Sequence, residues 1–138
     1  MNRITSKNIR QILIPAMEEH GFTHAFYPDC CVFVKRNEEG GKLERITVTQ
    51  FEYYKCIKIE IDILPTYLHL PFIDEKNVII ENRKVKKSSL EGWIYKTEED
   101  IKQILEMIKE SLEKKGFEYL DTILNDPEDL YPIYSEYK

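Results

Sequence analysis

Cys30, Cys31 and His24 are the residues whose types and spacing come closest to a catalytic arrangement. A thiol nucleophile needs a histidine base beside it, and these residues lie on short runs that could become neighbouring strands. Adjacent residues of a strand point to opposite faces, so a disulfide between the two cysteines would be strained. The chain has no glycine-rich phosphate loop, no Gly-x-Ser-x-Gly elbow and no His-Glu-x-x-His motif. We therefore assign no catalytic residue and do not expect an enzyme.

The same cysteines, with His20 and His24, are the candidate metal ligands of the chain. Their spacing matches no zinc-finger pattern, and Gly21 interrupts the helical register between the two histidines. We expect neither a metal nor another cofactor. The chain has three cysteines, an odd number that allows no closed disulfide framework. Because its first residues also lack the pattern of a signal peptide, a cytoplasmic protein is expected.

Paired carboxylates offer a second kind of chemistry. Glu60 and Asp62 alternate with isoleucines and therefore share one face of a predicted strand, where they could serve acid–base catalysis or bind a cation. Lys58 on the same face favours an ordinary solvated stripe instead. If a site does form there, its other wall is the apolar loop 65–72, which carries Tyr67 and His69. This pocket defines the alternative function, a small-molecule-binding protein or enzyme.

The charge balance weighs against two classes of partner. The chain holds 20 basic and 25 acidic residues, a formal net charge of −5, and such a chain repels a phosphate backbone. Its one basic cluster, within 83–87, is typical of a solvated loop. The longest uncharged run, 63–73, is too short and too interrupted by proline to span a bilayer. We predict no binding to nucleic acid or membrane.

Periodic apolar residues predict the elements that must position these side chains. An apolar stripe at helical spacing ends at Gly21-Phe22, and a second stripe near the other end of the chain ends at Gly116-Phe117. Runs that alternate with period two lie between them, most regularly at Ile57, Ile59, Ile61 and Ile63. We therefore expect a single α+β domain over residues 1–138. It has an antiparallel sheet of about four to six strands, flanked by an N-terminal and a C-terminal helix packed on one face.

Capping residues predict where the two helices begin. Thr5 or Ser6 should cap the first helix, which contains Pro15 and should therefore kink or restart there. Thr97 should cap the second helix, expected over 98–115, with Asp100 approximating a capping box.

Aromatic residues are left over on the sheet face turned away from the helices. If Ile46 and Val48 face the helices, Phe51 and Tyr53 face away from them. The C-terminal tail could fold over that face, a β-bulge could turn the rings into the core, or the face could bind a partner or a second copy. In the last case the candidate partner-binding residues are Phe51, Tyr53, Tyr131, Tyr134 and Tyr137.

Several short motifs are similar to those of small uncharacterised bacterial α+β domains. They are the helix 9–22 with Pro15 and its closing Gly21-Phe22, the strand 46–50, Trp93 followed by Thr97 and acidic residues, and Tyr119-Leu120-Asp121. The resemblance implies a domain of unknown function, similar to immunity proteins that bind secreted toxins, and it brings no catalytic residues. With the negative charge and surplus aromatic residues, it favours a non-catalytic protein that docks onto another protein, itself a monomer or weak homodimer.

Overall fold

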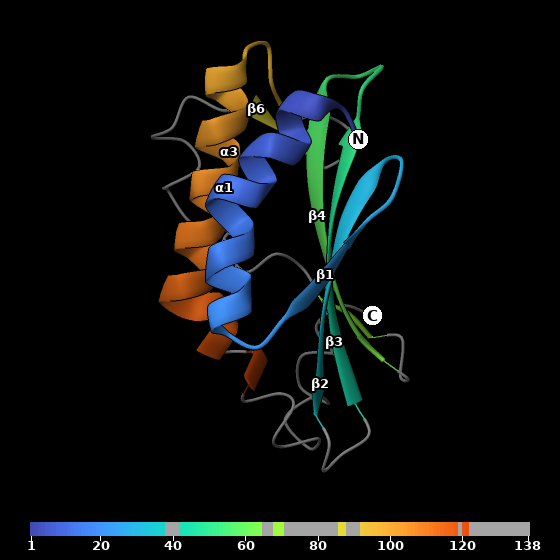
Figure 1. The fold of residues 1–138 in the computed structure, drawn as a ribbon, viewed down its shortest axis with the longest axis vertical. Helices are drawn as coiled ribbons and strands as arrows, with labels where there is room; N and C mark the ends of the chain where they lie inside the picture. The colour runs from blue at the N-terminus through green and yellow to red at the C-terminus, as the bar shows by residue number, and fades with distance from the viewer. Residues whose placement is uncertain (38–41, 65–67, 71–85, 88–91, 119, 122–138) are drawn as a thin grey trace.

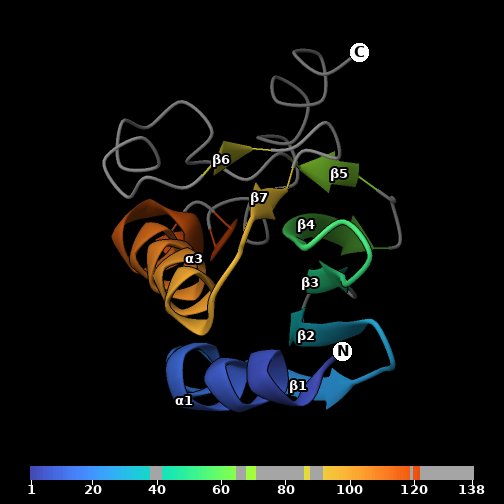
Figure 2. The ribbon, with the colours of Figure 1, turned by 90° about the horizontal axis from the view of Figure 1, so that it is seen from above.

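The computed structural model describes residues 1–37, 42–64, 68–70, 86–87, 92–118 and 120–121. Two helices form one layer and an antiparallel sheet forms the other (Figures 1 and 2), which confirms the predicted α+β arrangement. The elements in chain order are α1 (Arg3–Glu19), β1 (Thr23–Phe26), β2 (Cys30–Asn37), β3 (Lys42–Phe51), β4 (Cys56–Leu64), β5 (Leu68–Leu70), β6 (Lys86–Lys87), β7 (Trp93–Ile94) and α3 (Glu98–Ser111). A π-helical turn, Leu112–Gly116, continues α3.

The described strands form one sheet in the order β1-β2-β3-β4-β7-β6, and β5 also pairs with β4. Five of them, β1 to β5, have three or more residues, while β6 and β7 have two each. The pairing of β3 with β4 runs without interruption from Leu43 opposite Leu64 to Phe51 opposite Cys56. This continuous register rules out the β-bulge that could have turned the aromatic residues into the core.

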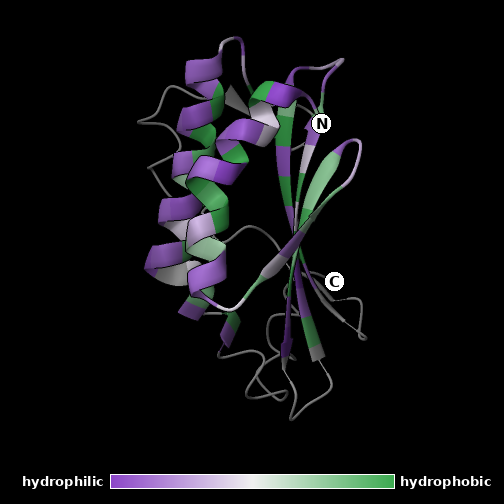
Figure 3. Cartoon of the chain, in the orientation of Figure 1, coloured by the Kyte–Doolittle hydropathy of each residue, from purple (hydrophilic) through white to green (hydrophobic). Residues whose placement is uncertain are grey.

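The core lies between the helices and one face of the sheet. Alternate residues of the long strands point to this inner face and are buried: Cys31, Phe33, Ile46, Val48, Ile57, Ile59 and Ile61. The apolar stripes of both helices cover them, and Figure 3 shows the hydrophobic residues of the helices turned towards the sheet. Each such fully buried aliphatic side chain contributes about 1.5–3 kcal/mol to folding, so the period-two pattern fixes which face of the sheet is covered.

The first helix begins earlier than the sequence predicted. Asn2, not Thr5 or Ser6, is its N-cap, because the Asn2 side chain accepts a hydrogen bond from the backbone N–H of Thr5 at 2.9 Å. Asparagine caps a helix as well as serine or threonine does, so the choice among three nearby candidates was open to error. Thr5 lies inside the helix and is buried. The helix continues through Pro15, whose side chain is exposed.

A glycine followed by a phenylalanine ends α1, whereas Gly116-Phe117 lies where helical backbone resumes after the π turn that continues α3. These two Gly-Phe segments pack together. Gly21 adopts a φ of +87°, and the N–H of Phe22 donates to the carbonyl of Met17 at 3.0 Å, which closes α1 as a Schellman motif. The ring of Phe117 stacks on His20 with 3.8 Å between ring centroids and lies 5.9 Å from Phe22. The repeated sequence pattern therefore builds one shared contact between the two helices.

The second helix has the predicted start and a different end. The hydroxyl of Thr97 accepts from the N–H of Asp100, and the carboxylate of Asp100 accepts from the N–H of Thr97, which confirms the capping box. Regular α-helical hydrogen bonding ends at Ser111 rather than near residue 115, because the wider π turn begins at Leu112. Neither described helix combines the length and the apolar character needed to cross a membrane.

Candidate interaction surface at the β3–β4 turn

The two most exposed large hydrophobic side chains of the described residues lie in the turn between β3 and β4. Tyr53 is 90% exposed and Tyr54 is 61% exposed. Their rings contact each other edge to face, with 5.0 Å between centroids and 83° between planes. Phe51, the last residue of β3, is half-buried and directly precedes this turn. We call Phe51, Tyr53 and Tyr54 the aromatic tip.

The sequence placed Phe51 and Tyr53 together on a strand, and the structure separates them. Strand β3 ends at Phe51, and Tyr53 belongs to a turn that spans residues 52–55. Lys55 closes the turn with a φ of +50°, a conformation that is uncommon for a residue with a side chain. Tyr53 is therefore exposed because it lies in a turn, and Tyr54 joins it although the sequence did not single it out.

A buried glutamine holds the base of this turn in place. Gln50 is only 3% exposed, and its side chain accepts from the backbone N–H of Asn2 at 3.0 Å and donates to the hydroxyl of Tyr95 at 2.8 Å. Its backbone N–H donates to the carbonyl of Asp29 at 2.8 Å, and the N–H of Tyr95 donates to the carbonyl of Lys55 at 2.9 Å. These bonds join the start of α1, the β1–β2 turn and the segment before α3 to the aromatic tip. The tip therefore rests on a rigid base.

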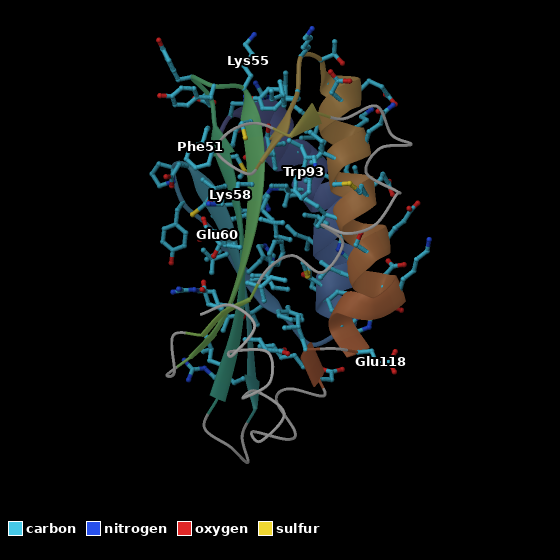
Figure 4. All side chains as sticks on the ribbon, turned by 180° about the vertical axis from the view of Figure 1, so that it is seen from behind. Phe51, Lys55, Lys58, Glu60, Trp93 and Glu118 are labelled. Carbon is cyan, nitrogen blue, oxygen red and sulfur yellow. The ribbon has the colours of Figure 1, made fainter. Side chains whose placement is uncertain are left out.

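The charged residues Arg45, Lys58, Glu60 and Asp62 on the outer face of β3 and β4 are paired. Figure 4 shows Phe51, Lys58 and Glu60 on the side away from the helices, whereas Trp93 points between the two layers. Lys58 lies 3.6 Å from Glu60, and Arg45 donates to Asp62 at 3.1 Å. The two carboxylates proposed for a ligand pocket each have a basic partner. Of the other proposed pocket residues, Tyr67 and the side chain of His69 lie outside the described residues.

The proposed tail residues Tyr131, Tyr134 and Tyr137 also lie outside the described part of the chain. Whether the tail covers the outer face of the sheet therefore stays a prediction.

The cysteines and histidines do not assemble a reactive centre in the described part of the chain. Cys31 is fully buried, and burial raises the pKa of its thiol to about 12, so it stays protonated at neutral pH. Burial, followed by the charge of Asp29, raises the pKa of Cys30 as well. His24 lies on the inner face opposite Phe33, with its Nδ1 3.9 Å from a carboxylate oxygen of Glu18. Within the described residues, no three His, Cys, Asp or Glu side chains group to hold a metal ion.

One chemically unusual residue was missed by the sequence reasoning. Glu44 is fully buried on the inner face, and neither of its carboxylate oxygens has a hydrogen-bond partner among the described residues. Burial raises the pKa of this carboxyl to about 7, against the opposing effect of Lys35, which faces it on β2. Lys35 itself donates to Asp121 at 3.0 Å. The sequence could have predicted this burial, because Glu44, Ile46 and Val48 are alternate residues of one strand and therefore point to the same face.

No family model, curated protein or solved structure matches this chain. The functional interpretation therefore depends on the geometry of the described residues themselves.

Proposed function

We propose that this chain is a non-catalytic binding protein, similar in role to immunity proteins, that docks onto another protein through the aromatic tip. The observation that carries the proposal is the exposure of Tyr53 at 90%, in edge-to-face contact with Tyr54 at 61%. Tyrosine supplies a large apolar ring together with a hydroxyl, and its side chain has few rotatable bonds. For these reasons tyrosine is enriched among the residues that dominate binding energy at protein interfaces.

The hydrogen bonds beneath the tip support the same proposal. Binding through a loop is weakened when the loop must first be ordered. Here Gln50, Tyr95 and Asp29 fix the turn from three sides, so the tyrosines are presented on a pre-organised support. The raised pKa values of Cys30 and Cys31 favour a binding role over thiol chemistry. Cys30 and Cys31 form no disulfide, which also fits the proposed cytoplasmic setting.

Affinity capture from a native extract, with mass spectrometry of the retained proteins, tests the proposal. We expect the wild-type chain to retain a stoichiometric protein partner, and Tyr53→Ala/Tyr54→Ala to lose it. A single aromatic anchor is worth about 2 kcal/mol or more at such a site, which is about thirtyfold in affinity. Tyr27→Ala is the matched control, because Tyr27 is a tyrosine 54% exposed in a different turn.

Two results would contradict the docking role of the tip. The first is a partner that binds wild type and Tyr53→Ala/Tyr54→Ala equally well. The second is a chain that repeatedly emerges from extract alone. Circular dichroism of the double variant should be unchanged, because both tyrosines are exposed and contribute little to the core.

A further inference from the structure

Strand β1 is the outermost strand at one end of the sheet, with α1 beside it (Figures 1 and 2). It pairs with β2, and no other described strand pairs with it. In an antiparallel pair, every second residue directs its N–H and C=O to the neighbouring strand, and the residues between direct theirs away. The N–H of Tyr27 donates to the carbonyl of Cys30 at 2.8 Å, so Ala25 and Thr23, which have the same parity, also bond to β2. The backbone groups of His24 and Phe26 therefore point to the open edge.

The edge is short and has α1 beside it, but it lacks the other features by which sheets avoid pairing with another chain. Soluble proteins protect such edges with lysine, proline, bulges or inward-pointing charges. Strand β1 reads Thr-His-Ala-Phe and contains no lysine, carboxylate or proline. Its pairing with β2 is regular from Thr23 opposite Val34 to Phe26 opposite Cys31, so no bulge twists it away. The side chains of Thr23 and Ala25 are exposed.

Two opposite charges of α1 lie directly above this edge. The guanidinium of Arg10 sits 4.3 Å from the centre of the Phe26 ring. The carboxylate of Glu18 lies 3.9 Å from the Nδ1 atom of His24. Arg10 and Glu18 are eight residues apart on α1, slightly more than two helical turns and about 80° around the helix. Each outward-facing backbone position of β1 therefore carries one charge of defined sign above it, positive over Phe26 and negative over His24.

From this arrangement we propose that β1 is a homodimerisation edge, which pairs antiparallel with β1 of a second copy about a two-fold axis through Ala25. This axis places His24 opposite Phe26 of the second copy, where their outward N–H and C=O groups can form about four backbone hydrogen bonds. It also brings Arg10 towards Glu18 of the second copy, and Glu18 towards its Arg10. The contact is isologous, and the small side chain of Ala25 lies at its centre.

The charge pattern is what selects a second copy over an unrelated peptide. A two-fold axis through Ala25 exchanges the positions above Phe26 and His24, and these positions carry opposite charges. Self-association therefore makes two reciprocal attractive contacts, which an arbitrary strand would not provide. A strand of four residues with two exposed ion pairs makes a small contact, so the dimer should be weak and should weaken further with added salt.

Sedimentation velocity over a concentration series up to about 1 mM, at low ionic strength, tests this dimer. We expect wild type to shift from monomer to dimer as its concentration rises. Glu18→Arg places arginines opposite each other across the axis, and Arg10→Glu places glutamates opposite each other. Each variant alone should dimerise at least about tenfold more weakly, because two attractive contacts become repulsive. Mixing the two variants should restore dimers, because every contact in the mixed pair is again attractive.

Two further variants separate this edge from general charge effects. Glu19→Arg makes the same charge change at an exposed position one residue along α1, about 100° around the helix, and should dimerise like wild type. Ala25→Lys places two lysines together at the axis and should abolish the dimer without disturbing the fold, because Ala25 is exposed. The proposal is overturned by a wild-type chain that remains monomeric at the highest concentration. It is equally overturned by mixed Glu18→Arg and Arg10→Glu chains that stay monomeric, or by Ala25→Lys dimers as strong as those of wild type.

Discussion

Replacing Glu44 by glutamine should remove the pH dependence that this carboxyl gives to the free energy of unfolding. Glu44 is fully buried, and burial raises the pKa of its carboxyl from 4.5 to about 7 in the folded chain. The folded state therefore binds the proton more tightly than the unfolded state between these two values. Because of this difference, the free energy of unfolding falls as pH rises from about 4.5 to about 7, and the loss is complete above pH 7.

The size of the effect follows from the same two values. One pKa unit corresponds to about 1.36 kcal/mol, so the shift of Glu44 from 4.5 to about 7 corresponds to about 3 kcal/mol. A glutamine has the size and shape of the protonated acid and does not ionise. Glu44→Gln should therefore be close to wild type in stability near pH 4.5, and more stable than wild type by about 3 kcal/mol at pH 8.

Urea unfolding of both proteins at several pH values from 4.5 to 8 measures this difference directly. Subtracting the two curves removes the titration of all groups that they share. Glu60→Gln is the matched control, because it makes the same substitution at a half-buried glutamate on the outer face of the adjacent strand. A Glu44→Gln curve parallel to that of wild type across this range would refute the reasoning. The carboxyl would then not be held in its protonated form by burial.

Three further predictions concern the stability of the fold and the burial of its core. Gly92→Ala should lower the free energy of unfolding, measured with urea, by about 1–3 kcal/mol, because the new Cβ would lie 2.6 Å from the backbone oxygen of Ile57. Retained stability would show that β7 is free to move. Thr97→Ala should lower the free energy of unfolding by about 1 kcal/mol, because the capping box is lost. Lys96→Ala, at the exposed neighbouring position, should lower it much less in the same assay. A thiol reagent at pH 8 should leave Cys31 unmodified in the folded chain and modify it in urea, and rapid modification of the folded chain would contradict its burial and its raised pKa.

Periodicity was sufficient to predict the layers of this fold. The alternation of isoleucines from 57 to 63 and the two helical stripes need only the repeat lengths of strands and helices. Those repeats correctly place Ile46 on the inner face and Phe51 on the outer one. The alternation also excludes a slip of one residue in the pairing of β3 with β4, because it would turn every one of these isoleucines towards solvent.

The ends of the helices and strands were harder to predict, because several neighbouring residues are each suited to begin or end an element. Asn2, Thr5 and Ser6 are all good helix caps, and only the packing of α1 decides among them. Phe51 and Tyr53 were both placed on the outer face of the sheet, yet the strand ends at Phe51. Tyr53 lies instead in the four-residue turn 52–55.

The two ends of this sheet have opposite characters, which explains why motifs reveal so little about function. Where α1 ends at Gly21, Phe22 packs against Phe117, and this pattern is visible because a core needs periodic apolar residues. At the other end, the tyrosines of the tip make few core contacts, so no periodicity constrains where they fall. A docking surface built on a turn can change its side chains without disturbing the core, provided that its support at Gln50 is kept. Gln50→Leu should therefore weaken capture of the partner while leaving both tyrosines in place, which separates the support of the surface from its contacts.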